Sequence, residues 1–184
     1  PLKYLAVIIG SGVVVLMFFV LTAKAFPDLM PNRVDTWTSR ISSFMNAEVT
    51  QEDYQIEQAK IAIATGGIQG LGPGKSIQKN FLPQSSSDFI FAIIIEEYGL
   101  IGGISLLVLY LWLLFRIVIV VQNSDTVFGK LLTIGVGIPI VFQALVNMGV
   151  AVEIFPVTGQ TLPLISSGGT SIWVTCLALG IILS

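Results

Sequence analysis

Four long stretches of the sequence carry no charged residue, and they constrain the fold more than any other feature. They cover residues 4–23, 98–115, 131–152 and 154–184. A helix of about 20 mostly apolar residues crosses the hydrocarbon core of a bilayer, and uncharged stretches of about 18 or more are the usual signature. The sequence therefore predicts an all-α, polytopic helical membrane protein.

We expect four spans, near residues 5–23, 89–121, 130–152 and 164–184, which together form part of one transmembrane domain over residues 1–184. The second predicted span has about 33 residues, or about 50 Å of helix against a core of about 30 Å, so it must tilt or project. The chain begins at Pro1 and ends within an apolar stretch. We therefore expect it to be a piece of a longer protein.

Most of the charge lies between the first two spans. Thirteen of the 20 charged residues fall within residues 24–88, which we predict to form a long, partly helical loop. Apolar residues at helical spacing indicate an amphipathic helix over residues 34–44, and a second helix is expected over residues 54–65, ended by Gly66. Arg116 and Lys130 flank the short turn between the second and third spans, which marks that turn as cytoplasmic and places the long loop outside.

The composition excludes several kinds of site. The sequence has no histidine and a single cysteine, so a histidine-based triad and a His-rich metal site cannot form within it. The net charge of −2, without a basic arm, gives no indication of nucleic-acid binding.

Asp88 stands where the long loop meets the second span, after Ser85, Ser86 and Ser87. One interpretation is structural, because Ser and Asp commonly cap the free N–H groups of a first helical turn. The other is chemical: a carboxylate at the mouth of a span can take a proton from a hydroxyl while nearby lysines hold a phosphate. Lys75 and Lys79 lie in the glycine-rich stretch just before it.

Two further acids, Glu96 and Glu97, follow within the apolar stretch, about 12 Å deeper along a helix. A carboxylate at membrane depth costs about 2.5 kcal/mol or more unless it is paired or faces a cavity. We expect at least one of them to face a polar interior or a basic partner, either as a structural ion pair or as part of a site.

The stretch before the last span contains helix-breaking and hydroxyl-bearing residues. Pro163 and the pair Gly168 and Gly169 interrupt helix regularity, and irregular backbone at membrane depth is tolerated only inside protein or along a cavity. The hydroxyls available to such a cavity are those of Thr161, Ser166, Ser167, Thr170 and Ser171. The alternative is that these small residues only allow close helix packing.

Three motifs together resemble one family. The stretches GGIQGLGPGKSIQKNFLP, SSSDFIFAIIIEEYG and NMG…FPVTGQTLPLISSGGTS resemble the bacterial SEDS proteins (FtsW, RodA and SpoVE), most closely the cell-division branch, FtsW. The resemblance covers residues from about 33 to the end. The sequence departs from common members at Gln84, Ser86, Glu153 and Thr158.

The resemblance implies a ten-helix enzyme of the bacterial cytoplasmic (inner) membrane that polymerises lipid II into peptidoglycan glycan strands, here at the division septum. The four spans would be helices seven to ten, and the family's essential aspartate matches Asp88. The implied partners are a class B penicillin-binding protein, which supplies the transpeptidase, and other divisome proteins.

Our hypothesis is therefore a peptidoglycan glycosyltransferase with Asp88 as general base. The leaving pyrophosphate needs cations, which basic side chains or a divalent ion (Mg²⁺ or Mn²⁺) would supply; no metal ligand is assigned. The predicted substrate-binding residues are Arg33, Arg40, Lys75, Lys79, Ser87, Glu96, Glu97, Ser166, Ser167, Gly168 and Gly169. The alternatives are a lipid II flippase (transporter) and a division scaffold.

Overall fold

The computed structural model describes residues 2–25, 51–82 and 85–183, and the secondary structure of these residues is helical. The chain forms two units, Pro1–Glu48 and Val49–Ser184. The described part of the first is one apolar helix, α1 (Leu2–Ala25), which contains the predicted span at residues 5–23. The amphipathic helix predicted over residues 34–44, with Arg33 and Arg40, lies outside the described residues.

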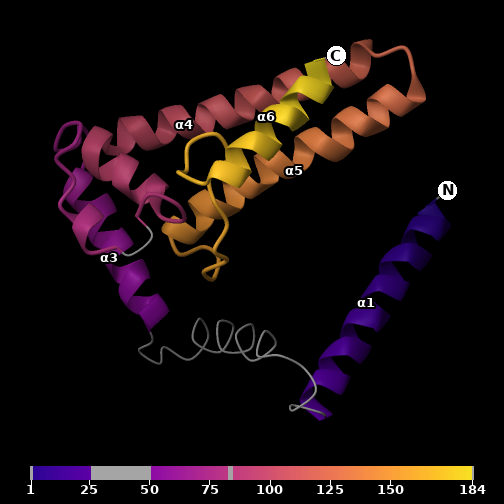
Figure 1. The fold of residues 1–184 in the computed structure, drawn as a ribbon, viewed down its shortest axis with the longest axis horizontal. Helices are drawn as coiled ribbons and strands as arrows, with labels where there is room; N and C mark the ends of the chain where they lie inside the picture. Colours follow the sequence, from indigo (N-terminus) through magenta and orange to yellow (C-terminus); the bar gives the residue numbers. More distant parts are fainter. Residues whose placement is uncertain (1, 26–50, 83–84, 184) are drawn as a thin grey trace. The chain divides into compact units, whose positions relative to one another are not determined.

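The second unit contains α3 (Gln51–Gly66), the short 3₁₀ helix η2 (Gln78–Asn80), α4 (Ile90–Asn123), α5 (Val127–Ala151) and α6 (Gly169–Leu183). α3 confirms the second helix predicted in the long loop and ends at Gly66 as expected. α4 and α5 run side by side, joined by a tight turn (Figure 1). The Thr126 hydroxyl caps α5 by accepting a hydrogen bond from the Gly129 N–H at 3.0 Å.

α4 and α5 are both long and apolar enough to cross a membrane. Many of their large apolar side chains are exposed, among them Trp112, Phe115 and Phe142, as expected for helices that face lipid. α6 begins at Gly169 and has 15 residues, five residues later than the predicted start of the last span. The reason is that residues 152–168 form an irregular connection, in which Leu164 adopts a positive φ of 68° that a helix does not allow.

α4 is interrupted at Gly99, where the backbone has φ 71° and ψ −172°. In a continuous helix the N–H groups of Leu100 and Ile101 would bond to the carbonyls of Glu96 and Glu97. Here the backbone of the glycine-rich loop after α3 provides the hydrogen-bond partners of these N–H and C=O groups instead. The predicted unbroken 33-residue span is therefore divided in two. The remainder, residues 100–123, is about 36 Å long as a helix, close to the thickness of a hydrocarbon core.

The exchanged hydrogen bonds pair two carbonyls and two N–H groups that the break separates. The Leu71 and Gly72 N–H groups donate to the Glu96 and Glu97 carbonyls, both at 2.9 Å. In return, the N–H groups after the break donate to the loop: Leu100 N to Gly67 O at 2.9 Å and Ile101 N to Ile68 O at 3.5 Å. Buried backbone groups must be paired, so the loop and the helix break require each other.

Glycines make this close approach possible. A Cβ atom on Gly99 would overlap the Ile68 carbonyl, and one on Gly70 would overlap the Glu97 carbonyl. Both glycines also have positive φ, which other residues rarely adopt. Gly103 lies against the side chains of Ile95 and Phe91 in the first part of α4, because the chain bends sharply at the break.

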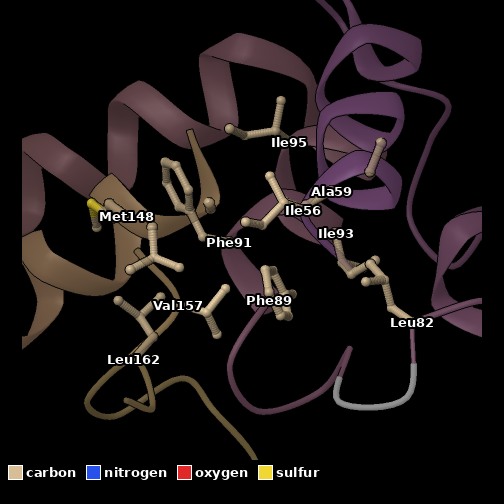
Figure 2. Close-up of a cluster of buried hydrophobic side chains, with 14 of the residues drawn as sticks. Ile56, Ala59, Leu82, Phe89, Phe91, Ile93, Ile95, Met148, Val157 and Leu162 are labelled. Carbon is tan, nitrogen blue, oxygen red and sulfur yellow. The ribbon is translucent and has the colours of Figure 1, made fainter. Parts of the chain in front are cut away.

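A buried apolar cluster holds the first part of α4 in place. Figure 2 shows Phe89 and Phe91 in one cluster with Ile56 and Ala59 of α3 and with Val157 and Leu162 of the connection before α6, while Ile95 lies on the α3 side of the cluster. Phe89 is 1% exposed and Leu162 is fully buried. Burial of each such side chain contributes about 1.5–3 kcal/mol, so the segment that follows Asp88 is fixed on two sides.

We predict that Gly99→Ala destabilises the protein by more than about 1 kcal/mol, since it combines a positive φ with a backbone overlap. The measurement is the thermal unfolding midpoint of the purified full-length protein in detergent. Gly135→Ala is the matched control: Gly135 lies within α5, a Cβ atom added there would meet nothing within 4 Å, and alanine favours a helix by about 1 kcal/mol. Equal midpoints for the two variants would contradict the exchange at Gly99.

Candidate functional site

Asp88 lies directly before α4 but does not cap it. The N-cap residue of α4 is Phe89, and no side chain makes a capping hydrogen bond there. The Asp88 side chain is partly exposed, and within the described part of the chain its carboxylate has no hydrogen bond and no ion pair. The capping interpretation of Asp88 is therefore wrong, and both carboxylate oxygens keep their lone pairs available.

The backbone around Asp88, in contrast, is firmly held through three consecutive carbonyl groups. Ser167 donates to the Ser86 carbonyl from its N–H at 2.9 Å and its hydroxyl at 3.0 Å. The Ser166 hydroxyl donates to the Ser87 carbonyl at 2.5 Å. The Asn147 side-chain amide donates to the Asp88 carbonyl at 2.8 Å. Segments about 60 to 80 residues apart in sequence thus meet at this one turn of chain.

The connection before α6 is tied to the helices in the same way. Asn147 donates a second hydrogen bond, at 2.6 Å, to the Gln160 carbonyl, and Gln143 donates to the Thr161 carbonyl at 2.9 Å. The Tyr110 hydroxyl of α4 donates to the Pro163 carbonyl. This arrangement puts Gly159 beside Asp88: a Cβ atom on Gly159 would lie 3.7 Å from Asp88 Oδ2.

Glu96 is fully buried and holds the glycine-rich loop. Its carboxylate accepts hydrogen bonds from the Ser76 hydroxyl at 2.5 Å, the Ile77 N–H at 3.0 Å and the Gln78 N–H at 3.3 Å. No cation pairs with it among the described residues. The expected need for a partner is thus met by hydroxyl and N–H donors, which stabilise a buried carboxylate as an ion pair would. Glu97 is only partly buried.

The two predicted lysines lie on the loop that Glu96 holds, and both are exposed. The Lys79 N–H donates to the Ser76 hydroxyl at 3.1 Å, and the Lys79 carbonyl accepts from the Ser85 hydroxyl at 3.1 Å. Hydrogen bonds therefore run from Glu96 through Ser76 and Lys79 to Ser85, three residues before Asp88. The lysine backbone is fixed while the ammonium groups face outward.

The other predicted site residues are placed as follows. Ser166 is 1% exposed, and its hydroxyl is used within the protein, because it also accepts the Leu162 N–H at 2.7 Å. Ser167 is exposed, Ser87 and Gly168 are partly buried, and Gly169 is exposed at the start of α6. Glu153, a departure from the family pattern, forms an ion pair with Lys60 of α3.

Sequence reasoning missed three residues of this network: Tyr110, Gln143 and Asn147. The available signal was the spacing of the two amides. Gln143 and Asn147 lie four residues apart in an otherwise apolar stretch, so they share one face of a helix, and a polar face within a predicted span marks a buried polar contact.

Within the ranges that the structure describes, the acidic side chains form no preassembled metal site. Among the residues that the structure describes, no three or more His, Cys, Asp or Glu side chains converge as metal ligands. Magnesium is commonly bound by one or two carboxylates together with substrate phosphates, and Asp88 is the unpaired carboxylate that this site offers.

A separate groove of about 390 Å³ lies between the two parts of α4 and the end of α5. Its lining is apolar and includes Ile63, Leu107, Met148 and Phe155. It offers no group that could donate, accept or move a proton.

Comparison with known proteins gives one consistent result. Residues 1–184 match the sequence profile of the FtsW/RodA/SpoVE family, described as cell cycle proteins. The chain is 41% identical over 150 residues to the probable peptidoglycan glycosyltransferase FtsW of Coxiella burnetii, covering 78% of this chain and 40% of that protein. It is 43% identical over 143 residues to the protein of the same name from Saccharophagus degradans, covering 74% and 37%. The chain thus spans about two fifths of the length of these relatives.

Two solved structures share the fold. A chain from a study of how a peptidoglycan synthase complex coordinates polymerization and crosslinking matches with a TM-score of 0.63 and 28% identity, over 93% of this chain and 46% of that one. A mutant of the rod shape determining protein RodA of Thermus thermophilus matches with a TM-score of 0.54 and 35% identity, over 67% and 38%.

We predict that Glu96→Gln lowers the free energy of unfolding by about 1–3 kcal/mol, because it removes a charged acceptor and turns an amide donor toward N–H and O–H groups. Thermal unfolding of the full-length protein measures this. Glu97→Gln is the matched control and is expected to change stability by less than about 0.5 kcal/mol. A Glu96 variant as stable as the Glu97 variant would show that the three hydrogen bonds do not hold the loop.

Proposed function

The chain belongs to the FtsW/RodA/SpoVE family of cell cycle proteins, and from this we propose that the whole protein is a peptidoglycan glycosyltransferase that polymerises lipid II, with Asp88 as general base. The observation that carries the proposal is the state of Asp88: its backbone is held by Asn147 while its carboxylate has no partner among the described residues. A general base needs both a fixed position and a free lone pair.

The proposed reaction is an inverting glycosyl transfer. Asp88 takes the proton from the 4-hydroxyl of the acceptor sugar, and the oxygen attacks the anomeric carbon of a second lipid-linked sugar. The bond from that carbon to the pyrophosphate oxygen breaks, and undecaprenyl pyrophosphate leaves with the electron pair. The proton remains on Asp88 until solvent takes it.

The leaving pyrophosphate needs positive charge nearby, and Lys75 and Lys79 are proposed to supply it. Both ammonium groups are exposed on a loop that Glu96 ties to α4, and a cation held on a fixed loop loses little freedom when it binds a phosphate. Ser87, Ser167, Gly168 and Gly169 complete the proposed substrate-binding surface, and Arg33 and Arg40 remain candidates. Glu96 and Ser166 are proposed to support this surface from within, since their polar atoms bind protein groups.

The membrane arrangement is part of the same proposal. Four spans place the loop of residues 24–88, with Asp88 at its end, on the outer face of the bacterial inner membrane, where the protein works at the septum with a class B penicillin-binding protein and other divisome proteins. Support comes from the two span-length helices α4 and α5 and from the likeness to a peptidoglycan synthase complex.

We predict that Asp88→Asn lowers the rate of glycan polymerisation at least about 100-fold, the contribution expected of a general base. The assay follows labelled lipid II into glycan strands with the full-length protein and its transpeptidase partner in detergent or vesicles. Asp125→Asn is the matched control, since Asp125 is an exposed acid in the turn between α4 and α5, and it should leave the rate unchanged. Full polymerase activity of Asp88→Asn would rule out the assigned role.

We also predict that Lys75→Met and Lys79→Met each lower kcat/KM for lipid II by about 10- to 100-fold, the loss expected for one charge-assisted contact. Lys79→Arg keeps the charge and should retain most of the activity. Lys130→Met, which removes a partly exposed charge near the start of α5, serves as the control. Lysine variants with the kcat/KM of the control would exclude these side chains from substrate binding.

A further inference from the structure

Asn147 occupies an unusual position for an amide. It lies in the last two turns of α5 and is 2% exposed, and it uses one nitrogen for both of its hydrogen bonds. One goes to the Asp88 carbonyl at 2.8 Å and the other to the Gln160 carbonyl at 2.6 Å. An amide nitrogen has two hydrogens, so its donor capacity is filled.

The chemistry of the two partners fixes the orientation of this amide. Both are carbonyl oxygens, so a flipped side chain would place its own oxygen against them and leave three acceptors without a donor. As placed, Oδ1 of Asn147 is buried without a hydrogen-bond partner among the described residues. The two donated bonds are therefore what offsets the burial of this polar group.

These two bonds join the segments on either side of the Asp88 carboxylate. Gln160 follows Gly159, where an added Cβ atom would lie 3.7 Å from Asp88 Oδ2. Ser166 and Ser167 hold the carbonyls before Asp88, and Gln143 holds only the far segment, at Thr161. Within the described part of the chain, Asn147 alone bonds to both Asp88 and the residue beside Gly159.

We propose that Asn147 is the positioning residue that sets the Asp88 carboxylate against Gly159 and so fixes where the base meets its substrate. Asn147 acts through the backbone of Asp88 and Gln160 and does not itself meet the reacting atoms. Its significance for catalysis rests on the polymerase function proposed above, whereas its effect on the position of Asp88 does not.

The first test measures position without activity. The full-length protein, with Cys176→Ser and any other native cysteine replaced, receives Asp88→Cys and Gly159→Cys, and disulfide formation is followed after mild oxidation. An added Cβ atom at Gly159 would lie 3.7 Å from Asp88 Oδ2, so thiols at the two positions start near one another, and a disulfide forms where the Cβ atoms come within about 3.5–4.5 Å. Gly159 has a φ of 66°, which is strained for a cysteine, and this strain is the same in every variant compared. Adding Asn147→Leu should slow crosslinking about tenfold, because two buried carbonyls lose their donor. Gln143→Leu is the matched control and should change the rate less than about twofold.

The second test measures turnover with Asp88 intact. Asn147→Leu should lower kcat for glycan polymerisation about 100-fold with little change in KM, as expected when a catalytic group is displaced by about 1 Å. Gln143→Leu should lower kcat less than about tenfold. Asn147→Ser, whose hydroxyl is too short to bond both carbonyls, replaces Asn147→Leu if that variant does not fold, with the same expectation.

Crosslinking at the parent rate in the Asn147 variants would overturn the proposal, and so would an equal loss in the Gln143 control, which would indicate a general loosening of the connection. If the Asp88→Cys and Gly159→Cys protein crosslinks as expected while the protein with Asp88 intact forms no glycan from lipid II, the proposed function is refuted and the positioning role remains supported.

Discussion

The structure depends on one backbone constraint, the exchange of hydrogen bonds at Gly99. A helix broken inside an apolar environment leaves N–H and C=O groups that nothing there can satisfy. The loop after α3 supplies the missing partners, so the Glu96 and Glu97 carbonyls and the N–H groups of Leu100 and Ile101 are all paired. Because the backbone of the loop packs directly against the backbone of α4, both segments need a glycine at the contact. The GGIQGLGPG motif is thus explained by packing before any chemistry is considered.

The exchange also explains how the polar segment up to Asp88 is fixed. Near its beginning, the segment is held by the helix break and by the Glu96 carboxylate. At its end, Asn147, Ser166 and Ser167 hold three successive carbonyls. The segment therefore contacts two separate parts of the helix bundle, and the exposed lysines and Asp88 occur between or beside these attachment points. A loop bound in this way can present charged side chains without ordering itself anew for each substrate.

Local patterns in the sequence predicted some of this and could not predict the rest. The long helices and the end of α3 at Gly66 follow from hydrophobic runs and glycine alone. The break at Gly99 does not, because apolar residues continue through it and a single glycine fits either a break or close packing. The partners of Glu96 lie 18 to 20 residues away and those of Asn147 lie 13 and 59 residues away, and no local periodicity encodes such contacts. Hence Asp88 was predicted as a site residue, whereas Asn147, which donates to its carbonyl, was not.

The two carboxylates near the start of α4 have very different surroundings. Asp88 and Glu96 lie eight residues apart, yet Glu96 is fully buried with three donors on its carboxylate, and Asp88 is partly exposed with none among the described residues. The Glu96 carboxylate is occupied by the hydrogen bonds that hold the loop, so its role is structural. The Asp88 carboxylate makes no described contact, and the residue is held instead through its backbone carbonyl. A fixed main chain and an unpaired side chain are the two conditions that a general base must meet, and among these two acids only Asp88 meets both.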